Sequence, residues 1–300
     1  EVWLRLGGGD DAEYRDHGVH VCAVAGYAAR GTLRFMRNAI LYTVLIAGAG
    51  CALFPFAWMI ATSLMTLQEA STAKLHVIPA DLQWQNYRDA MGAAPFGRYF
   101  LNTFGVASLV AVGVVFTSVL AGYAFARLEF RGKKLLFLLL LGTMMVPFEA
   151  MLIPNYLIII RLGWYDSYGA LVVPWCANAF SVFLMRQAFG MIPREYEDAA
   201  MLDGCGPVRF LITIAAPLAR PSIAIVGLFA FLGSYNALLW PLIVTSSESM
   251  RMIQVGLTFF STDAGVRTNL LMAASVVVIL PVVALYFATQ KGFVEGAAST

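Results

Sequence analysis

The chain alternates between long apolar runs and short polar connections. Six of the runs are about 20 residues long or longer and hold almost no charge, which is the length that an α-helix needs to cross a bilayer core. They lack the short alternation of polar and apolar residues that is typical of β-barrel strands. The pattern predicts an all-α polytopic membrane protein. Its six transmembrane helices are expected near residues 38–63, 101–126, 135–160, 169–190, 219–244 and 268–290.

The composition agrees with this class. Apolar residues make up 60% of the chain and charged residues 13%, whereas soluble domains are about 25% charged. The formal net charge of +2 is too small to indicate nucleic-acid binding. The four cysteines are widely separated and show no CxxC spacing, so they predict neither a disulfide framework nor a metal site.

The basic residues indicate the orientation of the chain. If the N-terminus is cytoplasmic, 14 of the 20 Lys and Arg residues fall on the cytoplasmic side, with one cluster over residues 127–134. This bias follows the positive-inside rule, so both termini are expected in the cytoplasm and the protein in the cell (inner or plasma) membrane. The outer connection over residues 64–98 is expected to hold one short helix near residues 83–91.

The first residues differ from the rest of the chain. Residues 1–37 contain a glycine run and several acidic residues, do not begin with Met and lack the segment order of a signal peptide. Two interpretations stay open: a flexible cytoplasmic tail, or a start site placed too early for a protein that begins near Met36. We expect residues 38–290 to form the transmembrane domain and residues 291–300 to form a short cytoplasmic tail.

A polar stretch, EYEDAAMLDGCGPVRFLITIAAP, interrupts the chain between the fourth and fifth apolar runs. Pro193 suits the start of a helix, acidic residues follow where the helix dipole favours negative charge, and Gly204 suits a C-cap. These features predict a short helix over residues 194–203 on the cytoplasmic side. Ala199 and Ala200 give this helix a small face that another chain can approach closely.

The segment DAAMLDGCGPVRFLITIAAP resembles the EAA loop of binding-protein-dependent ATP-binding-cassette importer permeases. That loop reads Glu-Ala-Ala, three residues, Gly, nine residues, then Ile-x-Leu-Pro. Here Asp198 opens the motif, Gly204 follows at the matching distance, and Ile214 and Pro217 close it. The resemblance is specific because the spacing is complete. Three residues depart from the pattern: Asp198 stands for Glu, Cys205 for Ala and Ala216 for Leu.

Further segments resemble the carbohydrate branch of these permeases, of the maltose and glycerol-3-phosphate importer type. They include AGYAFARLEFRGKK, MMVPFEAMLIPNYLII and SYNALLWPLIV, and the resemblance covers residues 38–295. It implies a type I importer permease fold with six spans and a loop over residues 191–217 that couples the chain to an ATPase. The residues expected to take part in coupling are Glu195, Glu197, Asp198, Ala199, Ala200, Asp203, Gly204, Ile214 and Pro217.

The resemblance also implies partners. In this family a second permease completes the pore, a pair of ATPase subunits binds from the cytosol, and an external binding protein delivers the solute. This chain has no Walker lysine motif, so ATP and Mg²⁺ are expected on the ATPase, and the chain itself is expected to be a non-catalytic subunit without cofactor or metal. The expected solute is sugar-like, with disaccharides, oligosaccharides, amino sugars and glycerophosphates all open.

Glu149 is an ionisable residue within the third apolar run, where a charge is costly unless it faces a cavity or a partner. Pro147 and Pro154 flank it and indicate a kinked or broken helix. Two interpretations stay open. In the first, Glu149 forms part of a gate or translocation path with Asn155 or Tyr156. In the second, it caps the outer end of a short span.

The fifth apolar run holds hydrogen-bonding and aromatic groups at Ser234, Tyr235, Asn236 and Trp240. They suit a solute with hydroxyl groups and apolar ring faces, although polar residues in spans also serve as contacts between helices. We favour a position along the translocation pathway. An ion-coupled secondary transporter of a small polar solute is the alternative function, but such proteins usually show repeated halves and intramembrane ionisable residues, for which Glu149 is the one clear candidate.

Overall fold

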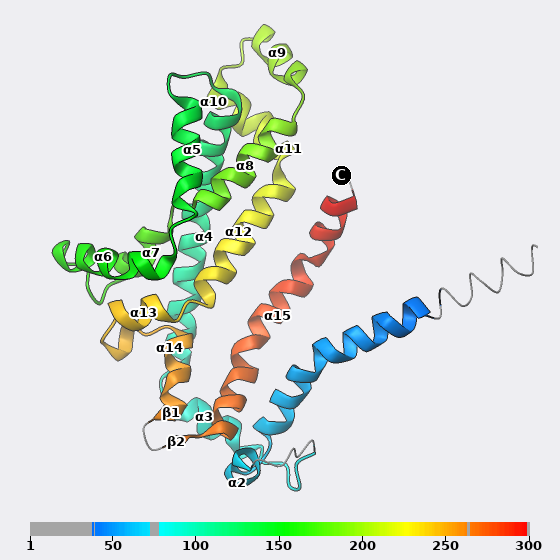
Figure 1. The fold of residues 1–300 in the computed structure, drawn as a ribbon, viewed down its shortest axis with the longest axis vertical. Coiled ribbons are helices and arrows are strands. Elements are labelled where there is room, and N and C mark those ends of the chain that lie inside the picture. The colour runs from blue at the N-terminus through cyan, green and yellow to red at the C-terminus, as the bar shows by residue number, and fades with distance from the viewer. Residues whose placement is uncertain (1–37, 39, 73–77, 263–264, 299–300) are drawn as a thin grey trace, which may run out of the picture. The chain divides into compact units, whose positions relative to one another are not determined.

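The described part of the chain is predominantly helical (Figure 1). It divides into two compact units, with the boundary between Met59 and Ile60. The expectations for residues 1–37 lie outside the described residues, and side chains are described up to Thr289. The computed structural model describes residues 38, 40–72, 78–262 and 265–298.

Three of the predicted spans are continuous helices that are long and apolar enough to cross a membrane. A helix satisfies its backbone hydrogen bonds within its own segment, which the interior of a bilayer demands. The first, second and sixth predicted spans are confirmed as helices, although the second begins earlier than expected. The three helices are Ile40–Ser63, α4 (Phe96–Arg127) and the part of α15 (Thr268–Ala298) up to Thr289.

The third apolar run is not one helix. It forms α5 (Lys133–Thr143) and α6 (Phe148–Arg161), which are bent by 98° from one another. Figure 1 shows α6 turning away from the direction of α5. Pro147 stands at the break in an extended conformation. It has no N–H with which a helix continuing from α5 could bond an earlier carbonyl. The expectation of a kinked or broken helix is confirmed, and the two helices together are long and apolar enough to form one broken span over the predicted region.

The fourth apolar run is bent as well. It forms α7 (Tyr168–Val172), the 3-10 turn η1 (Val173–Trp175) and α8 (Ala179–Met191), with a bend of 41°. Asn178 begins α8, because its side-chain oxygen accepts a hydrogen bond from the Ser181 N–H at 3.0 Å. This polar N-cap within an apolar run therefore marks the point where the span is broken.

The fifth apolar run is also interrupted. It forms α12 (Arg220–Tyr235) and then α13 (Leu239–Val244), so the expectation of one helix over 219–244 is wrong. Pro241 has no N–H with which a continuous helix would bond the carbonyl four residues earlier. Ahead of α12, and bent by 82° from it, lie α10 (Pro207–Phe210), the π-helical turn η2 (Leu211–Ala215) and α11 (Ala216–Leu218).

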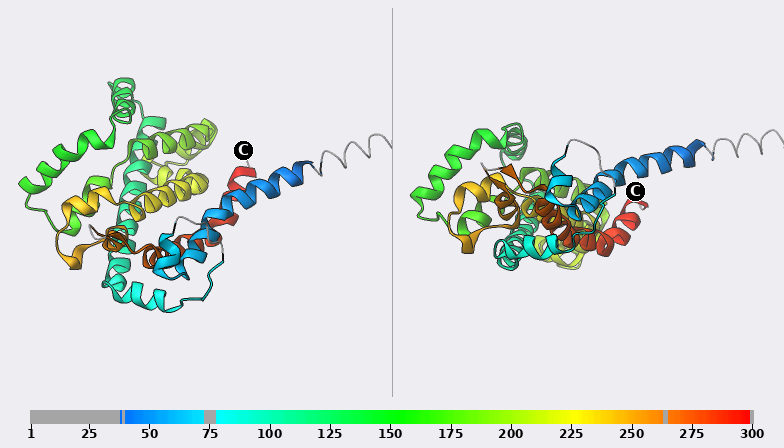
Figure 2. Two further views of the ribbon diagram at one scale, coloured as in Figure 1. Left: turned by 60° about the horizontal axis from the view of Figure 1, so that its bottom comes forward. Right: turned by 90° about the horizontal axis from the view of Figure 1, so that it is seen from below.

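α4, α8 and α12 pack together as the centre of the second unit (Figure 2). At Gly122, α4 comes so close to α8 that an added Cβ would lie 2.5 Å from the Cβ of Met185. A Cβ at Gly113 would likewise lie 2.5 Å from the Sγ of Cys176, whereas one at Gly105 would meet nothing within 4 Å. Small residues permit such close packing where van der Waals contact drives helix association.

Figure 1 places α9 and α10 at one end of this bundle and the shorter elements at the other. α3 confirms the helix expected near residues 83–91. The two strands are antiparallel, with Ser261 opposite Val266. The shorter elements are α2 (Leu67–Ser71), α3 (Gln85–Gly92), η3 (Glu248–Met250), α14 (Ile253–Leu257), η4 (Thr258–Phe260), β1 (Ser261–Thr262) and β2 (Gly265–Val266).

Asn102, a buried residue of α4, connects α4 to the loops at this end. Its amide nitrogen donates to the backbone carbonyls of Ser249 at 2.8 Å and Arg251 at 2.9 Å. Its amide oxygen accepts from the Tyr168 hydroxyl at 2.8 Å. Together these three hydrogen bonds hold α7 and the η3 region against α4.

Asp166 makes a second connection, between the α6–α7 loop and the chain after α13. Its Oδ1 accepts hydrogen bonds from the N–H groups of Ser246 at 2.9 Å and Ser247 at 3.1 Å. Partial burial raises the pKa of this carboxyl, but the hydrogen bonds from the two serines outweigh it and hold the pKa of Asp166 below its usual value.

Candidate solute cavity and coupling site

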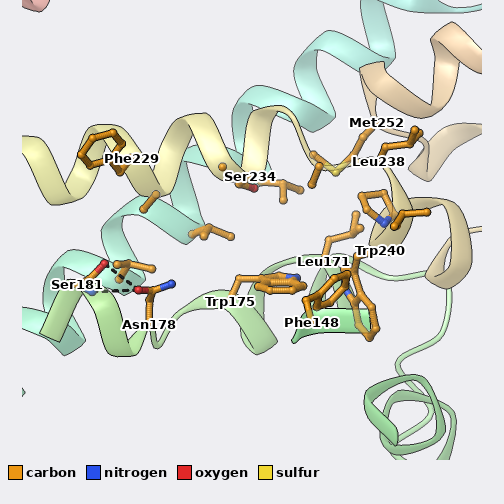
Figure 3. A pocket seen from close by; sticks show the side chains of 18 of the residues that line it. Phe148, Leu171, Trp175, Asn178, Ser181, Phe229, Ser234, Leu238, Trp240 and Met252 are labelled. Carbon is orange, nitrogen blue, oxygen red and sulfur yellow. Dashed lines mark hydrogen bonds between the residues drawn. The ribbon is translucent and has the colours of Figure 1, made fainter. Parts of the chain in front are cut away.

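A cavity of about 600 Å³ lies among α4, α6, α8, α12 and α13 (Figure 3). Most of its wall is apolar. The rings of Phe148 and Trp240 gather at one end, Asn178 and Ser181 lie at the other, and Trp175 lies between them. A concave apolar site with a few placed polar groups is the usual form of a small-molecule site.

The aromatic end of the cavity is held by specific contacts. The ring centroid of Trp175 lies 5.3 Å from that of Phe148 and 6.0 Å from that of Trp240. The Nε1–H of Trp240 donates to the Ala170 carbonyl at 2.8 Å, which satisfies the indole's one polar atom and leaves its ring for apolar contact. Among the described residues, no Lys, Arg, Asp or Glu lines the cavity. These walls suit a hydroxylated ring compound better than an ion.

The polar end of the cavity has a free donor. The Asn178 oxygen accepts from the Ser181 N–H at 3.0 Å and from its hydroxyl at 3.3 Å. Within the described part of the chain, the Asn178 amide nitrogen has no hydrogen-bond partner. It is therefore available to a hydroxyl group in the cavity.

Of the four residues that the fifth apolar run contributed to the expected pathway, Ser234 and Trp240 line the cavity. Tyr235 is 1% exposed, and its hydroxyl donates to the Val278 carbonyl of α15 at 2.7 Å. Asn236 is exposed and lies outside the cavity lining. Since successive residues of a helix point about 100° apart, the turn that brings Ser234 to the cavity carries Tyr235 to another helix.

Glu149, Asn155 and Tyr156 lie on α6 and do not line the cavity. Glu149 is exposed in the first turn of α6, where the helix dipole favours a negative charge. The ring of Tyr156 lies 6.4 Å from that of Tyr165. This placement agrees with Glu149 as a residue at the end of a helix, and its role in a gate stays a prediction.

Phe148, Trp175 and Asn178 were missed as cavity residues by the sequence reasoning. A signal for two of them exists in the segment VVPWCANAF, where Pro174 and an asparagine flank the tryptophan inside an apolar run. A proline followed by an N-cap residue indicates an interrupted span, and interrupted spans are tolerated where they line a cavity. Phe148 carries no comparable signal.

The predicted short helix in the polar stretch is confirmed as α9 (Arg194–Leu202). It begins after Pro193 and has acidic residues in its first turn. At its end, the Gly204 N–H donates to the Met201 carbonyl and the Cys205 N–H donates to the Ala200 carbonyl, both at 2.9 Å. This pair of bonds is a Schellman motif, and it requires the left-handed conformation that Gly204 adopts, with φ +73°.

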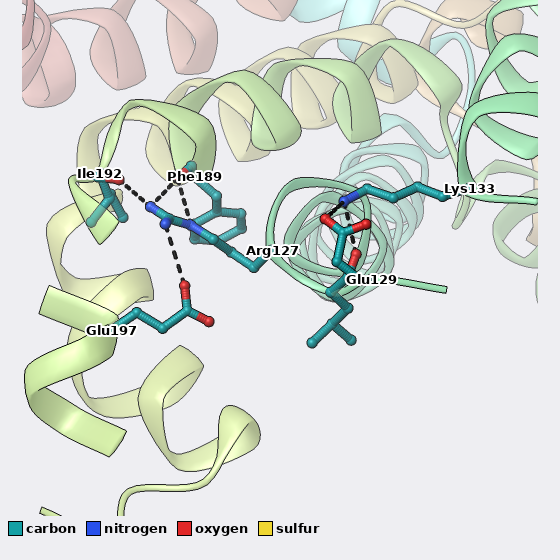
Figure 4. Close-up of polar contacts among 7 residues, drawn as sticks. Arg127, Glu129, Lys133, Phe189, Ile192 and Glu197 are labelled. Carbon is teal, nitrogen blue, oxygen red and sulfur yellow. Dashed lines mark hydrogen bonds and ion pairs between the residues drawn. The ribbon is translucent and has the colours of Figure 1, made fainter. Parts of the chain in front are cut away.

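Glu197 of α9 is paired inside the chain (Figure 4). Its carboxylate lies 3.3 Å from the Nη1 of Arg127, at the end of α4. Arg127 also donates to the Phe189 carbonyl, from Nε at 3.1 Å and Nη2 at 2.8 Å, and to the Ile192 carbonyl. The Arg127 side chain is 4% exposed and that of Glu197 16%. One guanidinium therefore joins α4, the last carbonyls of α8, and α9.

The residues expected to take part in coupling divide between two faces. Ala200 is buried, Ile214 and Pro217 are half-buried, and the exposed members are Glu195, Asp198, Ala199, Asp203 and Gly204. The exposed face also carries Tyr196, Met201 and Leu202, which sequence reasoning missed, and Leu202 is 90% exposed. Apolar side chains exposed beside carboxylates are typical of a surface that a protein partner covers.

The described residues hold no group of three His, Cys, Asp or Glu side chains that could bind a metal ion. Carboxylates and apolar side chains on α9 can bind another protein, and the cavity can bind a small uncharged group.

Residues 113–293, more than half of the chain, match the family described as "Binding-protein-dependent transport system inner membrane component". The sn-glycerol-3-phosphate transport system permease protein UgpE of Rhizobium meliloti is 32% identical over 276 residues, which cover 89% of this chain and 98% of that protein. Its counterpart in Yersinia enterocolitica is 33% identical over 264 residues, covering 85% and 94%. A solved bacterial ABC transporter involved in the import of the acidic polysaccharide alginate shares the fold, with a TM-score of 0.75 at 24% identity, covering 84% of this chain and 95% of that one. This chain belongs to the family of binding-protein-dependent transport system inner membrane components.

Proposed function

We propose that the chain is one of two permease subunits of an ATP-binding-cassette importer for a sugar or sugar-like solute. A second permease, a pair of ATPase subunits and an external binding protein complete the assembly, and ATP and Mg²⁺ bind to the ATPase. Both termini and α9 lie on the cytoplasmic side. The observation that carries the proposal is α9, a capped helix that Arg127 holds on one side and that is exposed on the other.

α9 is the part of the chain through which the ATPase moves the permease. Asp198 offers a charge, and the neighbouring Tyr196 and Leu202 offer apolar contact, to a groove on the ATPase. Because Arg127 ties α9 to the ends of α4 and α8, a displacement of α9 reaches two helices that line the cavity. The contacts of Arg127 favour a movement of α9 together with α4 and α8 over bending of the loop that holds α9.

The cavity supports recognition of a sugar by stacking and hydrogen bonding. The relatives are named for sn-glycerol-3-phosphate, but the cavity lining among the described residues includes no cationic side chain. A phosphate group would need charge-assisted donors, which this half of the pathway does not supply. We therefore favour a neutral sugar or the hydroxylated part of a larger solute as the group that this chain contacts.

ATP-driven uptake into cells or vesicles that contain all partners tests the proposal. We expect uptake to require ATP and the binding protein, and to persist when ion gradients are collapsed at constant ATP. Uptake that stopped with the gradients and ignored loss of the ATPase would instead establish an ion-coupled secondary transporter.

Gly204→Ala tests the role of the α9 cap. The left-handed conformation costs a non-glycine residue about 1–2 kcal/mol, so the cap is weakened and uptake should fall several-fold. Gly206→Ala is the matched control, because an added Cβ meets nothing within 4 Å at either position and only Gly204 has a positive φ. Equal uptake by the two variants would contradict a coupling role for the capped end.

A further inference from the structure

A second cleft, of about 880 Å³, lies at the end of the bundle where α4 ends and α5 begins. It is separate from the solute cavity, and the two share no lining residue. One part of its wall is apolar and another part carries three basic side chains and one acidic side chain. The lining is Phe125, Glu129, Phe130, Gly132, Lys133, Lys134, Leu135, Phe137, Leu138, Leu141 and Arg186.

The charges in this cleft are not balanced. Lys133 pairs with Glu129 at 3.1 Å (Figure 4). It also donates to the Leu128 carbonyl at 2.8 Å. That pair neutralises Glu129, which is the only carboxylate among the described residues of the lining. Among the residues that the structure describes, Lys134 and Arg186 have no carboxylate partner. The cleft therefore carries two uncompensated positive charges.

Arg186 is positioned without its charge being neutralised. Its Nε donates to the Phe125 carbonyl at 3.4 Å, and its guanidinium lies 4.1 Å from the centroid of the Phe137 ring. The ring contact is favourable for a cation but supplies no negative charge. The remaining guanidinium donors can bind the oxygens of an anion bidentately.

The apolar part of the cleft continues along α5. Leu135 is 61% exposed and Leu138 is 64% exposed, on a helix that has no buried residue. In a membrane such side chains contact acyl chains. A ligand that fills the cleft therefore needs an anionic head near Lys134 and Arg186 and an apolar tail along these leucines.

We propose that this cleft binds an anionic phospholipid of the cytoplasmic leaflet. The proposal rests on the orientation given under the proposed function, which places the start of α5 at the cytoplasmic surface. Basic pockets between spans on that side suit anionic headgroups. The lipid contacts Arg186, which lies on α8. The last carbonyls of α8 hold Arg127, so a bound lipid contacts the helix that Arg127 links to α9.

Native mass spectrometry of the complete transporter, extracted from nanodiscs that contain phosphatidylglycerol or only phosphatidylcholine, tests this site. We expect retained phosphatidylglycerol on the wild type and about five-fold weaker retention in Lys134→Gln, from the loss of about 1 kcal/mol. Arg186→Gln should weaken retention at least as much. Arg161→Gln, exposed at the end of α6, is the control that keeps the wild-type affinity.

Several outcomes would overturn the site. They are equal retention in Lys134→Gln and the control, equal retention of phosphatidylcholine, and full displacement of the lipid by millimolar inorganic phosphate, which would make the cleft a free-anion site. Labelling of Leu202→Cys from the cytosolic side checks the orientation by itself. ATP-driven uptake in phosphatidylcholine alone checks the importer function, so a failure of either remains distinguishable from a failure of the lipid site.

Discussion

Arg127 should be required for both the stability of the α9 end of the bundle and its coupling function. Its guanidinium makes an ion pair with Glu197 and hydrogen bonds to two carbonyls at the end of α8, Phe189 and Ile192. Arg127→Met keeps an apolar side chain of similar reach and removes every donor. The expected result is a loosened α9 that no longer moves with α4 and α8.

The magnitude follows from the groups that lose a partner. The Ile192 carbonyl loses its donor, and a carbonyl left without a donor in a mostly buried position costs about 1–3 kcal/mol. The Phe189 carbonyl loses both bonds from the guanidinium and keeps the Ile192 N–H at 3.4 Å, so it adds less. Loss of the ion pair adds less, because Glu197 is 16% exposed and water can reach its carboxylate. We expect Arg127→Met to lower the free energy of unfolding by about 3–5 kcal/mol, in the range for a broken buried pair. Glu197→Gln keeps an acceptor and should cost about 1 kcal/mol.

A double-mutant cycle in the purified complex measures the link. Unfolding by denaturant in mild detergent gives the free energies of Arg127→Met, Glu197→Gln and the double variant, and we expect the double variant to match Arg127→Met, because Glu197 has already lost its partner. Uptake and ATP hydrolysis are measured on the same samples, with hydrolysis expected to continue while uptake falls. Arg220→Met, exposed at the start of α12, should stay within about 0.5 kcal/mol of the wild type.

Two results would refute this reasoning. Arg127→Met could match Arg220→Met in stability and uptake, which would show that the guanidinium contacts carry no net energy. Alternatively, the costs of Arg127→Met and Glu197→Gln could simply add. In that case Glu197 acts on its own, and loss of ATPase binding by Glu197→Gln alone would assign it to the ATPase contact.

Three further substitutions, one of them with a matched control, test how the bundle is held together. Gly122→Ala should cost about 1–3 kcal/mol in free energy of unfolding, because its Cβ would lie 2.5 Å from that of Met185, whereas Gly105→Ala should cost less than 1 kcal/mol; equal values would contradict the close packing of α4 and α8. Asn102→Leu removes three hydrogen bonds and should lower the same quantity by about 2–4 kcal/mol, and a change below 0.5 kcal/mol would show that those loops are held by other contacts. The folded-state pKa of Asp166 is lowered, so this carboxylate stabilises the fold above its unfolded pKa of about 3.9 and its contribution is lost as the pH falls through the folded value. Asp166→Asn should therefore flatten the dependence of the unfolding midpoint on pH between about 5 and 2, and an unchanged slope would contradict it.

Local features of the sequence predicted a large part of the fold and the existence of α9. Hydropathy is summed over neighbouring residues, and the caps at Pro193 and Gly204 act on groups within one turn. The breaks at Pro147 and ahead of α13 are local too, because a proline removes one backbone donor wherever it occurs. The angle between the broken halves is not local, since it depends on the helices against which each half packs.

The tertiary structure alone decided the partners of the functional side chains. Glu197 could be assigned to a partner ATPase from its place in the motif, but Arg127 lies 70 residues away and only the packing of α4 against α8 brings the two together. Tyr235 and Ser234 are adjacent in sequence, yet one meets α15 and the other the cavity. The identity of a residue's neighbours across helices depends on helix rotation and on close contacts such as that at Gly122, which hydropathy and spacing do not encode.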